Sequence, residues 1–260
     1  MLQPFLEILL SIIHLFYSLL LSLQSKFNSA CKHFRALQEA LSLFENPVIS
    51  HSDNAKLLEL LEETPKIPSH LVVIMGNESI SYCDLVKLIS WSLPCGIAFL
   101  SFYDHKNVLS ADQLFKAVVK YNKDILPFIK WGKAFDEEVR TNSKQLINGF
   151  RWTPNLELSV FQKEDGKQLF INATKKLCYT VSDVKCINEA VIDASIRSSC
   201  SIPEPDLAII CGNTCSSFGL LPWSLRVTEF LMLPSHRNLF IKDFTSILKK
   251  YGSVEQRFGK

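Results

Sequence analysis

Short, strand-like apolar segments constrain the fold of this chain more than any other feature. Residues 71–75 and 207–210 are unbroken apolar runs, and residues 97–103 and 156–161 are further strand segments that polar residues interrupt. Parallel strands covered on both faces have such continuous runs, whereas a strand with one face in water alternates apolar and polar residues. A Ser81-x-x-Asp84 capping pattern opens a helical periodicity after the first run. Strands alternating with helices predict an α/β fold with a mostly parallel central sheet flanked by helices.

Further helices are expected where apolar residues recur at helical spacing. One is expected to begin after Ser110, and the others are expected near residues 54–63, 168–180, 182–196 and 243–251. Residues 130–149 are interpreted as helical on weaker periodicity. Residues 54–63 are rich in charged side chains and precede Pro65 and Pro68, so we expect a solvated connector there.

The segment from Pro4 to Leu23 is almost continuously apolar. About 20 helical residues, at about 1.5 Å per residue, match a bilayer core of about 30 Å. A cleaved signal peptide and an interfacial helix are the alternatives. Against them, no Lys or Arg precedes the apolar run, and its polar residues define no broad charged face. We therefore expect a transmembrane helix over residues 1–24.

Basic residues follow this segment and predict its orientation. Lys26, Lys32 and Arg35 lie just after it, so the positive-inside rule places the carboxyl-terminal part in the cytosol. The eight cysteines are scattered singly, which favours free thiols in a reducing compartment. After the transmembrane helix we expect a helical stalk and linker over residues 25–68 and one α/β domain over residues 69–260.

Composition and motifs argue against several functional classes. A net charge of +2 and the absence of a basic patch argue against a nucleic-acid partner. No G-x-S-x-G, P-loop or G-x-G-x-x-G pattern supports a hydrolase, an NTPase or a dinucleotide-binding protein. Cys211 and Cys215 lack supporting ligands, so no metal site is expected in this chain. Asp104 and His105 are either an acid/base pair or a polar strand-to-loop junction, which we favour because no nucleophile motif accompanies them.

The segment that follows residue 205 resembles the carboxyl-terminal part of cis-prenyltransferases, the undecaprenyl diphosphate synthase family. The residues that carry the resemblance are Asp206-Leu207-x-Ile209, Leu221-x-Trp223 and Glu229. Members of that family follow the strand with an Arg-x-Ser-Gly-Glu-x-Arg loop that grips a diphosphate. In this chain the two arginine positions fall on Ile210 and Ser216. The resemblance therefore implies that the frame is kept while the phosphate grip is lost.

The end of the first apolar run also resembles this family. Catalytic members carry Met-Asp-Gly-Asn there, and the Asp holds Mg²⁺ on the diphosphate. Here Gly76 occupies the position of that Asp. Ionisation of an allylic diphosphate requires cations that stabilise the leaving group. The resemblance thus implies that this chain alone is inactive and that Mg²⁺ is bound in a catalytic partner subunit.

The chain ends in Arg257-Phe258-Gly259-Lys260, and with Gly219-Leu220-Leu221-Pro222-Trp223 this ending resembles the non-catalytic, Nogo-B receptor-like subunits of eukaryotic dehydrodolichyl diphosphate synthase. The resemblance implies a heteromer with a catalytic cis-prenyltransferase subunit at the endoplasmic reticulum membrane. That complex extends farnesyl diphosphate with isopentenyl diphosphate to make precursors of dolichol for protein glycosylation. Arg257 and Gly259 would then contact isopentenyl diphosphate in the partner's active site. A disordered tail is the alternative.

An apolar segment near the carboxyl terminus is the expected partner interface. Its members are Trp223, Leu225, Glu229, Phe230 and Leu231. We interpret it as a helix that is too apolar on every side for a monomer surface. Related enzymes dimerise through this region, where Glu229 matches a family Glu; an ion pair with Arg226 is the alternative for Glu229. A membrane receptor or scaffold with a catalytically silent fold is the second functional hypothesis.

Overall fold

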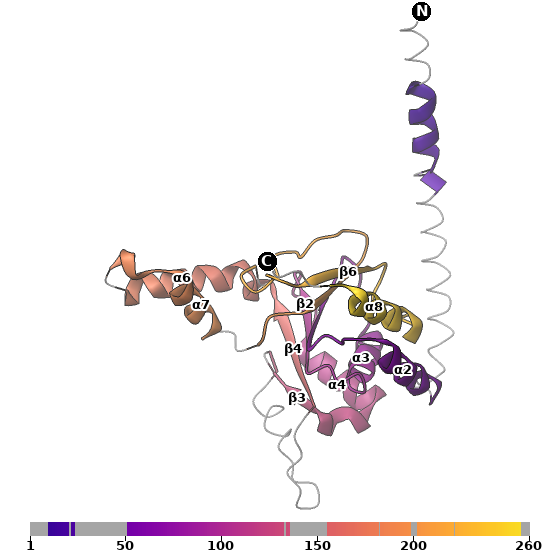
Figure 1. Ribbon diagram of the computed structural model, residues 1–260, viewed down its shortest axis with the longest axis horizontal. Coiled ribbons are helices and arrows are strands. Elements are labelled where there is room, and N and C mark those ends of the chain that lie inside the picture. Colours follow the sequence, from indigo (N-terminus) through magenta and orange to yellow (C-terminus); the bar gives the residue numbers. More distant parts are fainter. Residues whose placement is uncertain are drawn as a thin grey trace, which may run out of the picture. The chain divides into compact units, whose positions relative to one another are not determined.

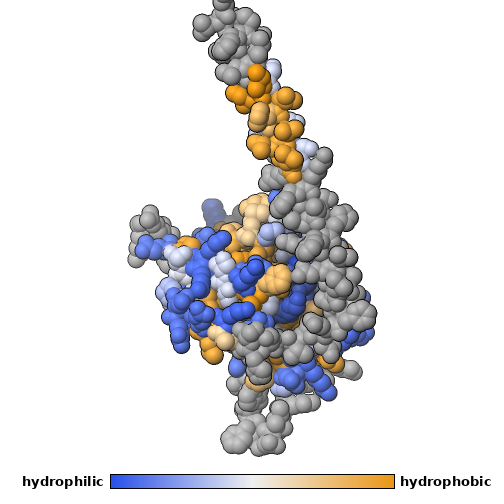
Figure 2. Space-filling view, turned by 90° about the vertical axis from the view of Figure 1, so that its right-hand side faces the viewer, coloured by the Kyte–Doolittle hydropathy of each residue, from blue (hydrophilic) through white to orange (hydrophobic). Residues whose placement is uncertain are grey.

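The computed structural model of this chain describes residues 10–20, 22–23, 51–132, 134–135, 155–181, 183–198, 202–220 and 222–255. The chain divides into two compact units, Met1–Asn46 and Pro47–Lys260. In the first unit, residues 10–20 are helical and expose apolar side chains (Figure 2). No helix within the described ranges is long and apolar enough to cross a membrane. Parts of the expected transmembrane segment, and the expected stalk before residue 51, lie outside these ranges.

A six-stranded parallel sheet forms the centre of the second unit, with strand order β3-β4-β2-β1-β5-β6 (Figure 1). The four predicted strands are present and adjacent as β1 (His70–Ile74), β2 (Phe99–Asp104), β4 (Leu156–Gln162) and β5 (Leu207–Cys211). Nearly every residue of these four strands is buried, which explains the unbroken apolar runs in β1 and β5. The prediction of a mostly parallel α/β sheet is confirmed.

Both edge strands replace helices that the sequence suggested. β3 (Ile129–Trp131) overlaps the start of the segment interpreted as helical, and most of the remainder of that segment is outside the described residues. The predicted helix around Trp223 to Leu231 is also wrong. Residues 222–224 form a turn, and β6 (Glu229–Leu233) is a strand. Leu231 and Leu233 pack on the core, whereas Phe230 and Met232 face outward. In a strand of only five residues this alternation is too short to distinguish it from a helical pattern.

The predicted helices are present, but the one expected over residues 182–196 begins only at Glu189, after a separate short turn. They are α3 (Tyr82–Ser92), α4 (Ala111–Tyr121), α6 (Lys167–Thr180), α7 (Glu189–Arg197) and α8 (Ile241–Ser253), together with the short turns η1 (Lys123–Phe128), η2 (Lys163–Asp165) and η3 (Val184–Cys186). At the start of α4, the Ser110 side chain accepts a hydrogen bond from the Gln113 backbone amide and so caps the helix.

The two faces of the sheet carry separate apolar clusters. Leu71, Val73 and Leu100 point into the larger cluster, which also contains buried residues of α3, α4 and α8. Val72 and Ile74 point to the opposite face and a smaller cluster, against which Leu169 of α6 packs. The helices α6 and α7 lie side by side and extend away from the sheet (Figure 1). The other residues that cover this second face come from loops, namely Ile202, Phe218, Leu220 and Leu225, so the central strands are buried on both faces.

Helix α2 (His51–Glu63) is part of this packed unit. Leu57 and Leu60 are each 1% exposed and belong to the larger cluster. The helix contacts α8, and a side chain added at Gly252 of α8 would overlap Thr64 just beyond α2. The interpretation of residues 54–63 as a solvated connector is therefore wrong. Their charged side chains cover only the outer side of a helix whose inner side is core.

Replacing Leu60 with Ala tests whether α2 contributes to the stability of the domain. We expect Leu60→Ala to lower the free energy of unfolding by about 2–5 kcal/mol, because a buried side chain is lost and a cavity remains. Leu58→Ala is the matched control, since Leu58 is 60% exposed on the same helix and should change stability by less than about 0.5 kcal/mol. Urea unfolding of the full chain measures both. Equal effects would show that α2 is not part of the core.

Candidate functional site

In open α/β folds, ligands bind at the carboxyl ends of the strands. From β1 the chain builds outward through β2, β4 and β3 on one side, and then adds β5 and β6 on the other. The strand order therefore reverses between β1 and β5. Open α/β sheets bind ligands outside the carboxyl ends of strands at such a reversal. Gly76, just after β1, and Cys211, at the end of β5, border this place.

The backbone itself closes the space between these two strand ends. A Cβ atom added at Gly76 would overlap the carbonyl oxygen of Cys211. Gly212 follows with a φ of 116°, and its amide donates a hydrogen bond of 2.8 Å to the carbonyl of Leu233. Only glycine fits at position 76 in this arrangement. No side chain, and hence no carboxylate, can project from the position where the resemblance places a metal-binding Asp.

The two positions that correspond to phosphate-binding arginines have packing roles. Ile210 is buried in the smaller apolar cluster beside Ile74. Ser216 accepts a hydrogen bond of 3.0 Å from the Phe218 amide through its hydroxyl and so shapes the loop after β5. Neither side chain can stabilise a diphosphate charge as a guanidinium does. The residues present do not fit the Mg²⁺-diphosphate chemistry of catalytic family members.

Metal ligands are not grouped in the described ranges, where no cluster of three or more His, Cys, Asp or Glu side chains is found. The thiol of Cys211 is buried, and burial raises its pKa to about 12. That thiol is therefore protonated near neutral pH and is a poor metal ligand. Six cysteines lie in the described ranges, and no disulfide joins any two of them.

Asp104 organises a loop and does not form an acid/base pair with His105. The Asp104 carboxylate is 1% exposed and accepts hydrogen bonds from the backbone amides of Lys106, Val108 and Leu109 at 2.9, 2.6 and 2.8 Å. The ring of His105 instead stacks on Phe218, with 4.2 Å between ring centroids. The structure thus favours the interpretation of this segment as a strand-to-loop junction.

A polar network that the sequence did not reveal joins the loops after β1 and β6. The Ser81 amide donates a hydrogen bond of 3.2 Å to Nε2 of His236, and the hydroxyl of Ser235 donates to Glu78. The Asp84 carboxylate accepts from the backbone amide of Asn238 at 2.9 Å. His236 is fully buried, and burial lowers its pKa, so that the imidazole is neutral and Nε2 accepts. These groups hold the loops in place.

The segment around Trp223 is fixed by polar contacts with α6 and α7. Trp223 Nε1 donates a hydrogen bond of 3.0 Å to Asp193, and the indole stacks on Phe170 at 5.8 Å between ring centroids. Arg226 pairs with Glu189 at 3.2 Å and with Asp193 at 3.7 Å. Arg226 therefore binds α7, in contrast to the alternative in which it pairs with Glu229. Hydrogen bonds from Arg197 and Trp223 lower the pKa of Asp193, which keeps the carboxylate ionised.

Outward-facing apolar side chains remain at the β6 edge of the sheet. Val227, Phe230 and Met232 are 40%, 37% and 43% exposed, whereas Leu225 and Leu231 are half-buried and pack inward. The predicted interface residues therefore divide into an inward and an outward set. Arg257 and Gly259 of the predicted tail lie outside the described residues.

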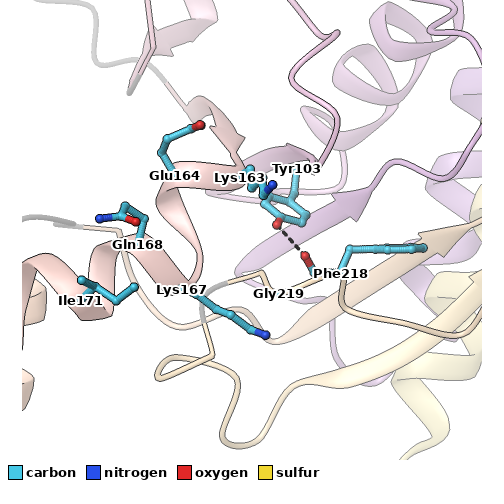
Figure 3. Close-up of a pocket in the computed structure, with 8 residues that line it drawn as sticks. All are labelled: Tyr103, Lys163, Glu164, Lys167, Gln168, Ile171, Phe218 and Gly219. Carbon is cyan, nitrogen blue, oxygen red and sulfur yellow. Dashed lines mark hydrogen bonds between the residues drawn. The ribbon is translucent and has the colours of Figure 1, made fainter.

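A pocket lies between the ends of β2 and β4 and the loop after β5 (Figure 3). Its volume is about 360 Å³, and its lining residues are Tyr103, Lys163, Glu164, Lys167, Gln168, Ile171, Phe218 and Gly219. The Tyr103 hydroxyl donates a hydrogen bond of 2.8 Å to the carbonyl of Phe218. Sequence reasoning proposed none of these residues as a site, because they come from three separate segments without a shared motif.

Comparison with curated proteins identifies the family. The chain is 33% identical over 204 residues to the human dehydrodolichyl diphosphate synthase complex subunit NUS1, covering 75% of this chain and 68% of the relative. The mouse subunit is 31% identical over 204 residues, covering 75% of this chain and 67% of the relative. The subunit from Schizosaccharomyces pombe is 28% identical over 205 residues, covering 75% and 78%. The chain belongs to the NUS1 family. No protein-family model matches it.

Solved structures agree on the fold of this NUS1-family chain. Lavandulyl diphosphate synthase from Lavandula x intermedia superposes with a TM-score of 0.54 at 15% identity, covering 75% of this chain and 99% of that structure. A probable undecaprenyl diphosphate synthase from Campylobacter jejuni gives 0.54 at 16% identity, covering 75% and 100%. The resemblance to cis-prenyltransferases that the sequence indicated is confirmed at the level of the fold.

Restoring a carboxylate at position 76 tests the closed strand ends. We expect Gly76→Asp to lower the free energy of unfolding by about 1–3 kcal/mol, because the new side chain must displace the Cys211 backbone. Asn77→Asp adds the same charge at the next, exposed position and should leave stability almost unchanged. Thermal unfolding of both variants measures the difference. A Gly76→Asp variant as stable as Asn77→Asp would mean that the space between β1 and β5 is open.

Proposed function

We propose that this chain is the accessory subunit of a dehydrodolichyl diphosphate synthase complex and is inactive by itself. The observation that carries the proposal is the packed backbone between Gly76 and Cys211, which leaves no room for a metal-binding side chain at the ligand edge of the sheet. The names of the relatives support the same conclusion, since each is a subunit of such a complex. A catalytic cis-prenyltransferase partner supplies the active site.

The chemistry of chain elongation explains why a partner is needed. Loss of diphosphate from an allylic substrate develops negative charge, which Mg²⁺ and arginines must stabilise. The positions for such groups in this chain are Gly76, Ile210 and Ser216, and none of them offers a charge. In the proposed complex, Mg²⁺ and the farnesyl diphosphate site belong to the partner, which adds isopentenyl diphosphate units to make polyprenyl diphosphate for dolichol and protein glycosylation.

The outer side of β6 is the proposed contact with the catalytic subunit. β6 is an edge strand with one unpaired backbone edge, and natural proteins usually cover such edges. Val227, Phe230 and Met232 add exposed apolar area there. Trp223 and Leu225 support this surface from the adjoining turn, and Glu229 begins the strand.

The last residues are proposed to complete the partner's substrate site. An Arg guanidinium can form a bidentate contact with phosphate, and a glycine lets its backbone amide approach closely. Arg257 and Gly259 offer both groups two residues apart. We assign them to the diphosphate of isopentenyl diphosphate in the partner's active site.

The apolar amino-terminal segment is proposed to anchor the complex to the endoplasmic reticulum membrane, with the α/β domain in the cytosol. The support is the length of the apolar run from Pro4 to Leu23 and the basic residues that follow it. A long polyprenyl product is insoluble in water, so synthesis next to lipid gives it a direct exit.

A mixing experiment tests the proposed function. Prenyl synthesis from radiolabelled isopentenyl diphosphate is measured for this chain alone, for a catalytic cis-prenyltransferase subunit alone, and for both after co-expression. We expect no product from this chain alone and a large increase when both are present. Equal activity of the catalytic subunit with and without this chain would contradict the proposal and favour a receptor or scaffold role.

Variants on the outer side of β6 test whether the gain in synthesis depends on the proposed contact. Phe230→Glu places a charge on the proposed contact and should reduce both co-purification of the two subunits and the gain in synthesis. Val119→Glu is the matched control, because Val119 is 39% exposed on α4 and lies outside the proposed contact. Equal effects of the two variants would exclude β6 as the contact.

Removal of the terminal guanidinium tests the role of the tail. In the assembled complex, Arg257→Ala should reduce kcat/KM for isopentenyl diphosphate by about tenfold or more, because a charge-assisted contact with phosphate is lost. Lys260→Ala removes a neighbouring positive charge and should have little effect. Subunit co-purification should be unchanged in both variants. Unaltered kinetics of the Arg257→Ala complex would show that the tail does not reach the substrate.

A further inference from the structure

A continuous series of hydrogen bonds joins the loop between β6 and α8 to the segment that leads from β1 into α3. Residues 234–240 join β6 to α8 (Figure 1). Each residue from 235 to 239 forms a hydrogen bond with a residue between 78 and 84. We call this contact between residues 78–84 and 235–239 the junction. It fixes the end of β6, which is the proposed contact with the catalytic subunit, and the start of α8, which leads to the carboxyl-terminal tail.

The two segments of the junction exchange their capping groups. In a Ser-x-x-Asp capping box, the carboxylate of Asp84 would accept from the backbone amide of Ser81. Instead, the Ser81 amide donates a hydrogen bond of 3.2 Å to Nε2 of His236. The Asp84 carboxylate accepts from the amides of Asn238 and Leu239 at 2.9 and 3.2 Å. Each segment therefore supplies the acceptor that the backbone of the other segment needs.

The imidazole of His236 faces a different partner on each of its nitrogens. Since Nε2 accepts from the Ser81 amide, Nδ1 carries the hydrogen of the neutral ring. Nδ1 lies 3.8 Å from a carboxylate oxygen of Glu78 and has no hydrogen-bond partner within the described residues. A proton on Nε2 would place two N–H groups face to face, whereas the charged ring would attract Glu78. The Ser235 hydroxyl donates to the same carboxylate, so a shift of the ring toward Glu78 also disturbs that contact.

Charged groups from both segments surround His236. Burial has the largest effect and lowers its pKa from the ordinary value of 6.5. The charges of Glu78 and Asp84 and the backbone of Ser79 raise this pKa, and the charge of Arg237 lowers it. The folded chain thus binds this proton less readily than the unfolded chain. The stability that neutral His236 contributes is therefore present at neutral pH and decreases as the pH falls below 6.5.

His70, a second buried histidine, lacks this response because of its hydrogen-bond partners. Its Nδ1 lies 2.7 Å from the carbonyl oxygen of Pro203, and its Nε2 lies 2.9 Å from the hydroxyl of Ser101. A hydroxyl can donate or accept, so a protonated His70 keeps both partners. Nε2 of His236 faces a backbone amide, which can only donate. Protonation therefore changes the contacts of His236 and leaves those of His70 in place.

We propose that His236 is a proton-controlled positioning residue, which holds the junction while it is neutral and moves from the Ser81 amide to Glu78 when it is protonated. Loss of the contact with Ser81 loosens the loop that fixes β6 and α8. The consequence for assembly rests on the proposed function, because β6 is the proposed contact with the catalytic subunit. The proton response of the junction belongs to this chain alone.

Histidine NMR and hydrogen exchange of the full chain alone test the junction. The ¹⁵N spectrum of the imidazole should show a hydrogen on Nδ1 at neutral pH. Between about pH 7.5 and about pH 5, the protection of the Ser81 amide, corrected for intrinsic exchange, should decrease about fivefold or more. The Met75 amide, which donates to the Tyr103 carbonyl at 2.8 Å, is the internal reference and should stay protected. A hydrogen on Nε2 at neutral pH, or equal protection of Ser81 at both pH values, would overturn the proposal.

His236→Gln separates the acceptor from the proton. Its amide oxygen can accept from Ser81 but does not titrate, so the protection of Ser81 should be the same at both pH values. His236→Leu has no acceptor and should lose the protection at both. His105→Gln is the matched control, because His105 stacks on Phe218 and lies outside the junction. This control should respond to pH as the unaltered chain does. Equal pH responses of the His236→Gln variant and the unaltered chain would refute a role for the proton.

Binding to a catalytic cis-prenyltransferase subunit extends the test to the complex. Between about pH 7.5 and about pH 5.5, the affinity of the unaltered chain should fall about fivefold or more beyond that of the His236→Gln variant. Titration of the partner affects both chains equally and cancels in this comparison. Equal losses of affinity would contradict the role of His236 in assembly. Failure of both chains to bind at neutral pH would contradict the proposed function alone, since exchange of the Ser81 amide is measured without a partner.

Discussion

The contact between the backbones of Gly76 and Cys211 determines what the carboxyl edge of this sheet can do. β1 and β5 are paired from Leu71 to Ile74, so their ends emerge side by side with no freedom to separate. The glycine after β1 lets the carbonyl of Cys211 come within the distance that a Cβ atom would otherwise occupy. Gly212 then bonds to Leu233 and brings the end of β6 to the same edge. The place where related folds bind ligands is here used for packing.

Several carboxylates in this chain likewise hold the structure together. Asp104 at the end of β2 and Asp84 in the first turn of α3 each accept hydrogen bonds from two or more backbone amides. Asp206 likewise accepts from the amides of Ser69 and His70 at 2.8 and 2.9 Å, which joins β5 to the start of β1. A carboxylate that accepts hydrogen bonds from backbone amides of a neighbouring segment holds that segment in place. These residues are part of the scaffold.

The sequence predicted the parts of the fold that are buried on both sides. β1 and β5 have unbroken apolar runs because both of their faces lie in apolar clusters, and that pattern has few alternatives. β3 has only three residues, and β6 is exposed on alternate positions, so neither edge strand has a distinctive pattern. The burial of Leu57 depends on α8, which lies far away in the sequence, and no local signal reveals it. Resemblance located Gly76, but only the structure gives the steric reason for a glycine there.

The packing of α2 against α8 has a consequence for the proposed tail. α8 ends at Ser253, and the carbonyl of Val254 accepts a hydrogen bond of 2.5 Å from Lys66, which lies just after α2. A Cβ atom added at Gly252 would overlap the methyl group of Thr64, so the two segments are closely packed. The chain that follows Val254 therefore begins at a fixed position. A tail that must place Arg257 within a partner's site gains from such an anchor, because a short tether from a rigid origin samples less space. The residues just after α2 thus also fix the position at which the carboxyl-terminal segment begins.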